Sequence, residues 1–278
     1  MIDDPDAEEH QNRIITNGVV VFDNVTFKWD PYKPHKALCQ LNFEIKSGEK
    51  IAVFGESGAG KSCIIKLFSR YLDPMRNGTI HIDGSDITDC DLKYLRREME
   101  VMSEHYFFKG TLKENLYLST SAQDPGASDV EAMEFEKFLR HQIGLKPRKE
   151  GLDFEVESNG NNLTFLEKQL ISFARIFLDK KKLILMDDGF GDFLGLDSAK
   201  NLLKILFKEF RNSTMIVCSS NIATVLNFEK VMVLKYGRVI EFDTPANLQK
   251  MENGIFRSMV DDFQQKKTMR RVTSYRHG

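Results

Sequence analysis

An eight-residue glycine-rich segment constrains the fold of this chain more than any other feature of its sequence. Residues 55–62 read GESGAGKS and match the pattern G-x-x-x-x-G-K-[ST] at every fixed position. The apolar stretch IAVF precedes the segment and apolar residues at helical spacing follow it, so it is expected to join a strand to a helix. This strand–loop–helix context is the one in which the pattern binds phosphate groups.

The residue types of this loop suit a chain of phosphates with a bound cation. Glycines let backbone N–H groups turn inward around a phosphate, and a helix N-terminus adds unpaired donors and a favourable dipole. Lys61 is expected to reach the β- and γ-phosphates, and the Ser62 hydroxyl is expected to coordinate Mg²⁺. The residues expected to line this phosphate site are Gly55, Glu56, Ser57, Gly58, Ala59, Gly60, Lys61, Ser62 and Cys63.

A second candidate site residue lies downstream, at the end of an apolar stretch. Asp187 follows LILM, a short run of the kind that forms a strand buried in a parallel sheet. A carboxylate at this place is expected to hold the same Mg²⁺ through water. Helical spacing predicts helices over residues 92–99 and 163–178, and strands that alternate with helices indicate an α/β core. The helix-rich region around residues 112–160 is expected to be an inserted lobe.

Composition excludes some functions and partners. With 278 residues and a net charge of −2, nothing global indicates nucleic-acid binding. The four cysteines are scattered without C-x-x-C spacing, which favours a reducing compartment over a disulfide framework or a metal site. No apolar run approaches the roughly 20 residues needed to span a bilayer. The first residues, MIDDPDAEEHQN, are acidic and do not resemble a signal peptide.

Segments beyond the phosphate loop resemble the nucleotide-binding domain of ATP-binding-cassette (ABC) transporters of the exporter type. GTIHIDGSDI (78–87) followed by LKYLRREMEVM (92–102) resembles the segment that leads to the family's glutamine loop. GTLKENL (110–116) resembles the exporter pattern that follows that loop. VMVLKYGRVIEFDTPANL (231–248) resembles the family's closing hairpin and the helix after it. The resemblance covers nearly everything from residue 19 to residue 256.

The resemblance implies ATP as the ligand and a RecA-like P-loop core with an antiparallel β-subdomain and an inserted helical subdomain. The nucleotide-binding domain is then expected over residues 18–258, with the helical subdomain at about 104–168. A flexible acidic N-terminus (1–17) and a basic C-terminal tail (259–278) flank it. The family's adenine-stacking aromatic residue falls on Trp29, whose indole is a good platform for a base, although simple packing is the alternative.

Four functional positions depart from the family pattern. Asp188 stands where the family has the glutamate that polarises the attacking water, and its side chain is one methylene shorter. A misplacement of about 1 Å can cost on the order of 10²-fold in rate. Ser220 occupies the position of the switch histidine, and the glutamine of the glutamine loop falls on Ser103 or Glu104. The loop before Asp197 is longer than usual, which leaves the dimer-facing role of that residue open.

The fifth departure is the family's signature sequence, Leu-Ser-Gly-Gly-Gln. This chain reads LTFLE at residues 163–167. The signature glycines let a partner subunit's γ-phosphate approach bare backbone at a helix N-terminus, whereas Phe165 and Leu166 add bulk and Glu167 adds negative charge. Thr164-x-x-Glu167 is also a capping-box pattern, which would satisfy two backbone donors within the chain. A well-capped helix is therefore the favoured interpretation.

Two functions follow from these observations. The favoured one is an ATP-binding ABC module with lost or very slow hydrolysis, acting as a structural or regulatory subunit of a membrane transporter or complex. The alternative is an active exporter ATPase that drives transport with Asp188 as a weaker base. Either function implies a membrane-spanning partner, separate or in the same polypeptide, and another ABC domain is a further candidate partner. The expected location is a membrane, reached through partners, on a reducing cytosolic or organelle-matrix face.

Overall fold

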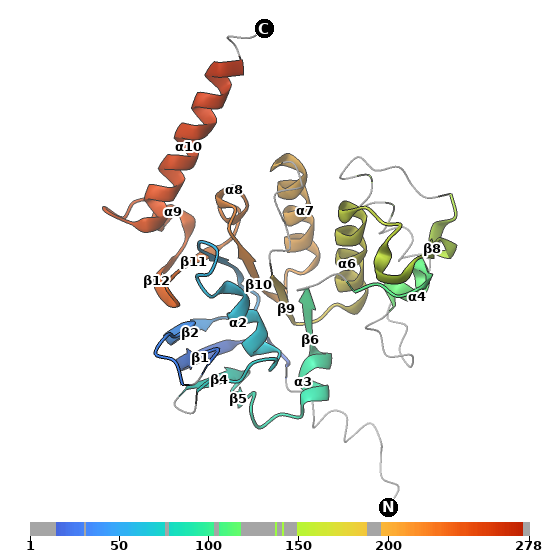
Figure 1. Cartoon of the computed structure of the whole chain (residues 1–278), viewed down its shortest axis with the longest axis horizontal. Coiled ribbons are helices and arrows are strands. Elements are labelled where there is room, and N and C mark those ends of the chain that lie inside the picture. The colour runs from blue at the N-terminus through green and yellow to red at the C-terminus, as the bar shows by residue number, and fades with distance from the viewer. Residues whose placement is uncertain are drawn as a thin grey trace, which may run out of the picture.

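The computed structural model describes residues 15–30, 32–75, 78–102, 106–117, 137, 141, 149–187 and 196–274. Of residues 179, 196–199 and 266–274 it describes the backbone alone. Its centre is a six-stranded sheet in the order β12-β11-β3-β10-β9-β6 (Figure 1). All neighbouring pairs are parallel except β11 with β12. The strands are β3 (Lys50–Phe54), β6 (Met99–Met102), β9 (Leu183–Asp187), β10 (Thr214–Ser219), β11 (Lys230–Lys235) and β12 (Arg238–Asp243).

The three middle strands of this sheet explain where a site can form. β3, β10 and β9 are apolar runs that are buried almost throughout, as expected for parallel strands covered on both faces. Register aligns Cys218 of β10 with Asp187 at the end of β9, and Ser219 with Phe54 at the end of β3. The carboxyl ends of the three strands therefore share one edge, which is where ligands bind in open α/β sheets.

A smaller antiparallel sheet packs beside the first one, with α2 (Lys61–Phe68) between them (Figure 1). Its order is β2-β1-β4-β5. One buried apolar cluster joins residues of both sheets and of α2, and the ring of Phe22 lies 5.1 Å from that of Phe68. The strands are β1 (Val20–Phe27), β2 (Leu38–Ile45), β4 (Thr79–Ile82) and β5 (Ser85–Asp86).

A third group of elements lies beyond the β6 edge of the main sheet (Figure 1). It contains β7 (Gly110–Thr111), α4 (Leu112–Leu116), the single turns Gly151–Asp153 and Ser158–Gly160, β8 (Glu155–Val156) and α6 (Phe165–Asp179). Arg175 of α6 donates from Nε to the carbonyl oxygen of Asn115 at 2.6 Å and so ties α6 to α4. Burial lowers the pKa of Arg175 to about 10, and the nearby Glu100 opposes that shift. Much of the expected lobe at 112–160 lies outside the described residues.

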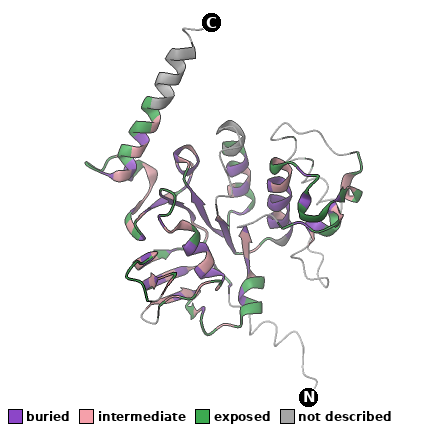
Figure 2. Cartoon of the chain, in the orientation of Figure 1, coloured by how far each residue is buried: buried purple, intermediate pink, exposed green. Residues whose placement is uncertain are grey.

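Five further helices complete the described chain. The longest one, α10, extends away from the body, and its first turns bury Phe256 and Val260 against the apolar cluster of the main sheet (Figures 1 and 2). The segment expected as a basic tail, residues 259–278, is thus helical as far as Ser274. The helices are α3 (Leu92–Glu98), α7 (Leu196–Glu209), α8 (Ile222–Val225), α9 (Pro245–Leu248) and α10 (Ile255–Ser274).

The carboxylate of Asp83 holds the start of the described chain. Backbone N–H groups of Thr16, Asn17 and Gly18 donate to its Oδ2 at 2.7 to 3.0 Å, and that of Val19 donates to Oδ1 at 2.8 Å. Burial acts to raise the pKa of Asp83, but these four donors outweigh it, so the pKa lies below its ordinary value. Residues 15–17, assigned on sequence to the flexible N-terminus, are therefore held against the core.

Candidate functional site

The phosphate loop leaves the start of α2 without a side-chain cap. Gly60 is the N-cap residue, with φ 108° and no side-chain cap hydrogen bond. A Cβ atom at this position would lie 2.7 Å from Leu38 Cδ2 and 2.9 Å from the Ala37 carbonyl oxygen. Only glycine fits both the backbone angle and the space. The first turn of α2 therefore presents backbone donors and the positive end of the helix dipole to the loop.

The side chain of Lys61 folds back onto the start of the phosphate loop. Its Nζ donates to the carbonyl oxygens of Gly55 at 2.8 Å and of Glu56 at 3.0 Å. These contacts hold the ammonium group beside the turn of backbone that would surround a phosphate. The geometry fits the role predicted for Lys61, because a cation at this place can face the phosphates without first crossing the pocket.

A cavity of about 450 Å³ opens at the carboxyl edge of the main sheet, beside this loop. It brings together residues from the β1–β2 connection, the phosphate loop, the end of β9, the turn after β10 and the turn between β11 and β12, which are far apart in the sequence. The predicted site residues that line it are Trp29, Ser57, Gly58, Gly60, Lys61, Ser62, Cys63, Asp187 and Ser220. The sequence therefore predicted a set of residues that the fold does gather, although their roles remain predictions.

Trp29 stands at this cavity as an exposed aromatic side chain. It is 61% exposed, so it does not belong to the core. Its ring meets the ring of Phe27 edge to face at 5.1 Å, and Lys66 Nζ lies 5.9 Å from its centroid. These contacts support the indole and leave it free to stack against a planar group.

Asp187 and Cys63 both line the cavity and interact electrostatically. Burial raises the pKa of the Cys63 thiol, Lys66 opposes the shift, and the Asp187 carboxylate adds to it. The thiol therefore stays protonated near neutral pH and is unsuited to nucleophilic chemistry. Asp187 ends β9 and lines the same cavity as Ser62, so a carboxylate and a hydroxyl are present there, and Mg²⁺ prefers such oxygen donors.

The turn after β10 positions Ser220. The backbone N–H of Asn221 donates to Ser219 Oγ at 3.1 Å, and the Asn221 side chain caps α8 by accepting from the N–H of Ala223. Ser220 is exposed between these two fixed residues and lines the cavity. Its hydroxyl can therefore reach a ligand in the cavity as a neutral hydrogen-bond donor.

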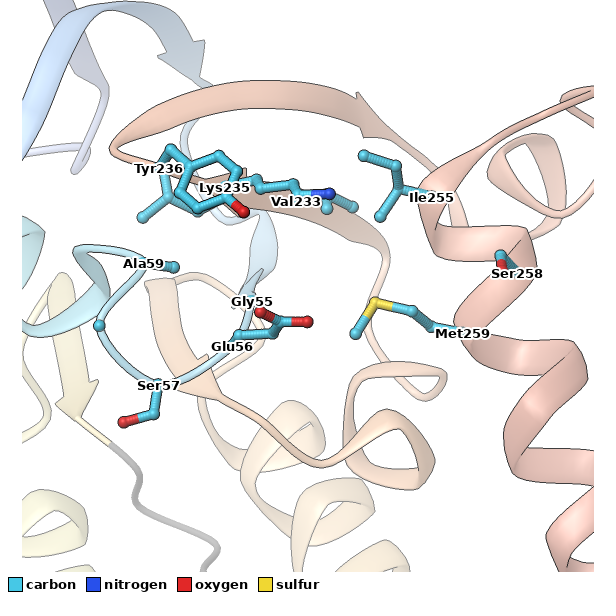
Figure 3. Close-up of a pocket in the computed structure, with 12 residues that line it drawn as sticks. Gly55, Glu56, Ser57, Ala59, Val233, Lys235, Tyr236, Ile255, Ser258 and Met259 are labelled. Carbon is cyan, nitrogen blue, oxygen red and sulfur yellow. The ribbon is translucent and has the colours of Figure 1, made fainter.

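A second hollow shares Ser57, Gly58 and Tyr236 with the first one. Its volume is about 340 Å³, and it lies between the phosphate loop, the end of β11 and the first turns of α10 (Figure 3). Three residues that the sequence assigned to the nucleotide, Gly55, Glu56 and Ala59, line this second hollow. Gly55 also has a packing reason to be glycine, because a Cβ atom there would lie 2.3 Å from the Leu234 carbonyl oxygen.

The predicted capping box at the start of α6 is confirmed. Thr164 is the N-cap residue, and its Oγ1 accepts from the backbone N–H of Glu167 at 3.3 Å. In return, Glu167 Oε2 accepts from the N–H of Thr164 at 2.9 Å. Leu166 packs against the apolar cluster of the main sheet, whereas Phe165 stays 43% exposed. The bulk predicted for this helix end is thus divided between a partly buried leucine and an exposed phenylalanine.

Some predicted positions cannot be placed. Ser103, Glu104 and Asp188 lie outside the described residues. The backbone of Asp197 is in the first turn of α7, but its side chain is not described. The predictions for these four residues therefore rest on the sequence alone.

Sequence reasoning missed five residues that line the first cavity. Two of them, Tyr236 and Gly237, form the turn of the hairpin expected within residues 231–248, but no local signal indicates that this turn lies beside the phosphate loop. The other three belong to the connection between β1 and β2, whose path depends on tertiary packing. The missed residues are His35, Lys36, Ala37, Tyr236 and Gly237.

The fold and the cavity together define a P-loop nucleotide-binding domain. Residues 38–191 match the ABC transporter family. The chain is 32% identical over 255 residues to "Oligomycin resistance ATP-dependent permease YOR1" of Saccharomyces cerevisiae, a match that covers 87% of this chain. It is 30% identical over 265 residues to "ATP-binding cassette sub-family C member 10" of Mus musculus, covering 94% of this chain. The chain therefore belongs to the ABC transporter family.

A solved structure supports the same assignment. The chain superimposes on a bacterial Atm1-family ABC exporter with ATP bound, with a TM-score of 0.78 and 26% identity over 90% of this chain and 42% of the other. The predicted ABC ATPase fold is thereby confirmed. The chain spans 17% of each of the two curated relatives. In the part of the chain that the structure describes, no helix is long and apolar enough to cross a membrane.

Proposed function

We propose that this chain is the ATP-binding module of an ABC exporter-type assembly and that it hydrolyses ATP very slowly or not at all. In this proposal it acts as a structural or regulatory subunit of a membrane transporter or complex. The observation that carries the loss of hydrolysis is the capped N-terminus of α6, held by Thr164 and Glu167. The ATP-binding part rests on the cavity beside the uncapped N-terminus of α2.

The residues of that cavity fit Mg²⁺ and ATP. Its volume of about 450 Å³ lies within the range of ordinary small-molecule sites. Lys61 and the first turn of α2 would bind the phosphates, Ser62 and Asp187 would hold Mg²⁺, and Trp29 would orient the base. Mg²⁺ when bound would neutralise charge on the β- and γ-phosphates.

The start of α6 explains why a partner's ATP would be handled poorly. The resemblance to the family places this helix end opposite the γ-phosphate on a partner subunit. Here the carboxylate of Glu167 accepts from the Thr164 N–H at 2.9 Å, so that donor is satisfied within the chain. The same carboxylate would repel a phosphate, and the exposed Phe165 would obstruct its approach. This half of a shared site is thus unsuited to stabilise a transition state.

The chain's own half-site also lacks the expected catalytic side chains. Asp188 is shorter than the glutamate that it replaces, and Ser220 lines the cavity with a neutral hydroxyl where the family has an imidazole. A shorter base and a neutral contact each weaken positioning of the attacking water. With both halves altered, a dimer of two such chains would bind ATP more readily than it would cleave it.

The assembly would provide the membrane-spanning part. The relatives of this chain include a protein named as a permease and a structure described as an exporter, and this chain matches only a fraction of each. We therefore propose a transmembrane domain, in the same polypeptide or as a separate subunit, as the partner. Another ABC domain is the second proposed partner, because an ABC site is closed by two domains.

Single-turnover hydrolysis of bound ATP tests the proposal. At a protein concentration high enough to favour dimers, with Mg²⁺ present, we expect ATP to bind and to remain intact, at a rate below roughly 0.1 s⁻¹ against 1–10³ s⁻¹ for typical enzymes. Lys61→Ala serves as the matched control, because it removes the phosphate-facing cation. Faster turnover that depends on Lys61 would contradict the proposal and support the alternative, an active exporter ATPase. Loss of that turnover in Asp188→Asn would then identify Asp188 as the base.

A further inference from the structure

The turn between β11 and β12 has an unusual first residue. Lys235 pairs with Arg238, so the connecting loop is only Tyr236 and Gly237. Both have positive φ, 48° for Tyr236 and 71° for Gly237. Positive φ at both loop residues is the mark of a type I′ hairpin turn, whose first position favours asparagine, aspartate or glycine. A tyrosine at that position is not explained by the turn.

Tyr236 also differs from most of the other non-glycine residues that have positive φ. Within the described residues, eight non-glycine residues have positive φ, and four of them are Asn or Asp. Those four side chains tolerate the left-handed region because they are short and polar. Tyr236 is the aromatic member of the set, which is Asn24, Gln40, Arg70, Asp83, Asn159, Lys180, Tyr236 and Asn253. Strained backbone of this kind gathers at functional sites, so the tyrosine calls for a functional reason.

Hydrogen bonds fix the tip of the hairpin between the phosphate loop and β2. The N–H of Gly237 donates to the carbonyl oxygen of Ala59 in the phosphate loop at 3.1 Å. The carbonyl oxygen of Gly237 accepts from the N–H of Cys39 in β2 at 2.7 Å. A Cβ atom at Gly237 would lie 2.4 Å from the Ala37 carbonyl oxygen, so the contact is close. Tyr236 therefore projects from a fixed point, not from a loose loop.

Packing does not account for the ring of Tyr236. The residue is 81% exposed, and the ammonium group of Lys235 lies 5.6 Å from its ring centroid. It lines the same cavity as Trp29, Lys61 and Asp187. Tyr236 also lines the second hollow, together with Ala59 of the phosphate loop (Figure 3). An exposed ring of this kind offers a π-face to a ligand, whereas a phosphate gains nothing from it.

We propose that Tyr236 is a second nucleobase-contacting residue, which together with Trp29 forms an aromatic pair that holds the adenine base of ATP. The proposal rests on the proposed function, because it requires ATP to bind in this cavity. Trp29 comes from the β1–β2 connection and Tyr236 from the β11–β12 turn, and both side chains line the same cavity. Two aromatic contacts would tighten binding of the base without hydrogen-bond readout, so other purine nucleotides would also bind.

The turn itself supplies a discriminating variant. Tyr236→Asn removes the ring and places the favoured residue at this position of a type I′ turn, so the fold is retained. Tyr236→Phe keeps the ring and is the matched control. Calorimetric titration of the 278-residue chain with Mg²⁺-ATP and with Mg²⁺-tripolyphosphate, which has no base, separates the two parts of the ligand.

Each outcome has a definite meaning. We expect Tyr236→Asn to bind ATP about tenfold more weakly than the wild type and Tyr236→Phe to bind within about twofold, with tripolyphosphate affinity unchanged in both. ATP affinity of Tyr236→Asn equal to that of the wild type would overturn the inference, as would equal weakening for both ligands. If the wild type binds ATP no better than Lys61→Ala does, the proposed function itself fails, and the inference fails with it.

Discussion

Two helices in this chain begin with the same kind of backbone donors, but one start has a side-chain cap and the other has none. α2 begins at Gly60 with no side-chain cap, beside a cavity that holds a lysine and an aspartate. α6 begins at Thr164 with a complete capping box. Every helix start has unpaired backbone donors, so what differs is only which groups satisfy them. Of these two helix starts, the sequence leaves the backbone donors of α2 open to an outside acceptor and satisfies those of α6 within the chain.

A substitution at Gly60, the N-cap residue of α2, is expected to have the largest effect on the uncapped helix start. In Gly60→Ala, the new Cβ atom would lie 2.9 Å from the Ala37 carbonyl oxygen, and the backbone would keep φ at 108°. We expect a loss of about 3 to 4 kcal/mol in the free energy of unfolding and loss of ATP binding. Gly58→Ala is the matched control, because its φ is also positive but its Cβ atom would meet nothing within 4 Å. Denaturant unfolding should show a cost of only about 1–2 kcal/mol there, and equal costs for both variants would contradict the steric argument.

Ligand addition tests whether the open helix end binds as expected. Mg²⁺-ATP at a hundredfold excess over its dissociation constant should raise the free energy of unfolding by about 2.7 kcal/mol. Lys61→Ala should lose most of this stabilisation, and chelation of Mg²⁺ should reduce it in the wild type. Thermal unfolding with and without nucleotide measures the shift. No difference between the wild type and Lys61→Ala would show that the N-terminus of α2 is not an anion site.

Removal of the Thr164 cap tests the role of the capping box at the start of α6. Thr164→Ala deletes the side chain that accepts from the Glu167 N–H, and we expect a loss of about 1 kcal/mol in stability. ATP affinity of the isolated chain should stay the same, because Thr164 does not line the cavity. Urea unfolding and a nucleotide titration on one preparation give both values. A change in ATP affinity without a change in stability would mean that α6 contacts the chain's own nucleotide.

The smallest expected effect concerns Asp83, whose carboxylate accepts hydrogen bonds from four backbone N–H groups of the same chain. Its pKa lies below the ordinary value of 3.8, so its stabilising effect is fully present above that pH. The contribution is lost as the pH falls through the lowered pKa. Unfolding measured between pH 5 and about pH 2 should therefore show a decline that is smaller in Asp83→Asn. Parallel pH profiles of the two proteins would contradict this assignment.

Features that depend on neighbours in the sequence were predictable. The bounds of β3 and the start of α2 follow from the apolar stretch and the glycine pattern, and both agree with the structure. The capping box of α6 was predictable in the same way, because its two residues are three positions apart in the sequence. The predicted helix at 92–99 is α3, which ends at Glu98. Each of these depends on contacts within one or two turns of chain.

Features that depend on distant partners were not predictable. β6 follows α3 directly and is a strand because it pairs with β9, more than eighty residues later. Tyr236 lies at the cavity on a turn whose Gly237 N–H donates to the carbonyl oxygen of Ala59, 178 residues earlier. The role of Asp188 stays a prediction, because its position depends on a loop outside the described residues. One sequence carries no local sign of such pairings.

The position of Trp29 has a practical consequence. It is the single tryptophan of the chain, and it is an exposed ring at the mouth of the cavity. Indole emission from this protein therefore comes from one place, the place where a base would stack. Occupancy of the cavity can be followed in solution from the intrinsic fluorescence of the unlabelled chain, with no dye and no background from a second indole.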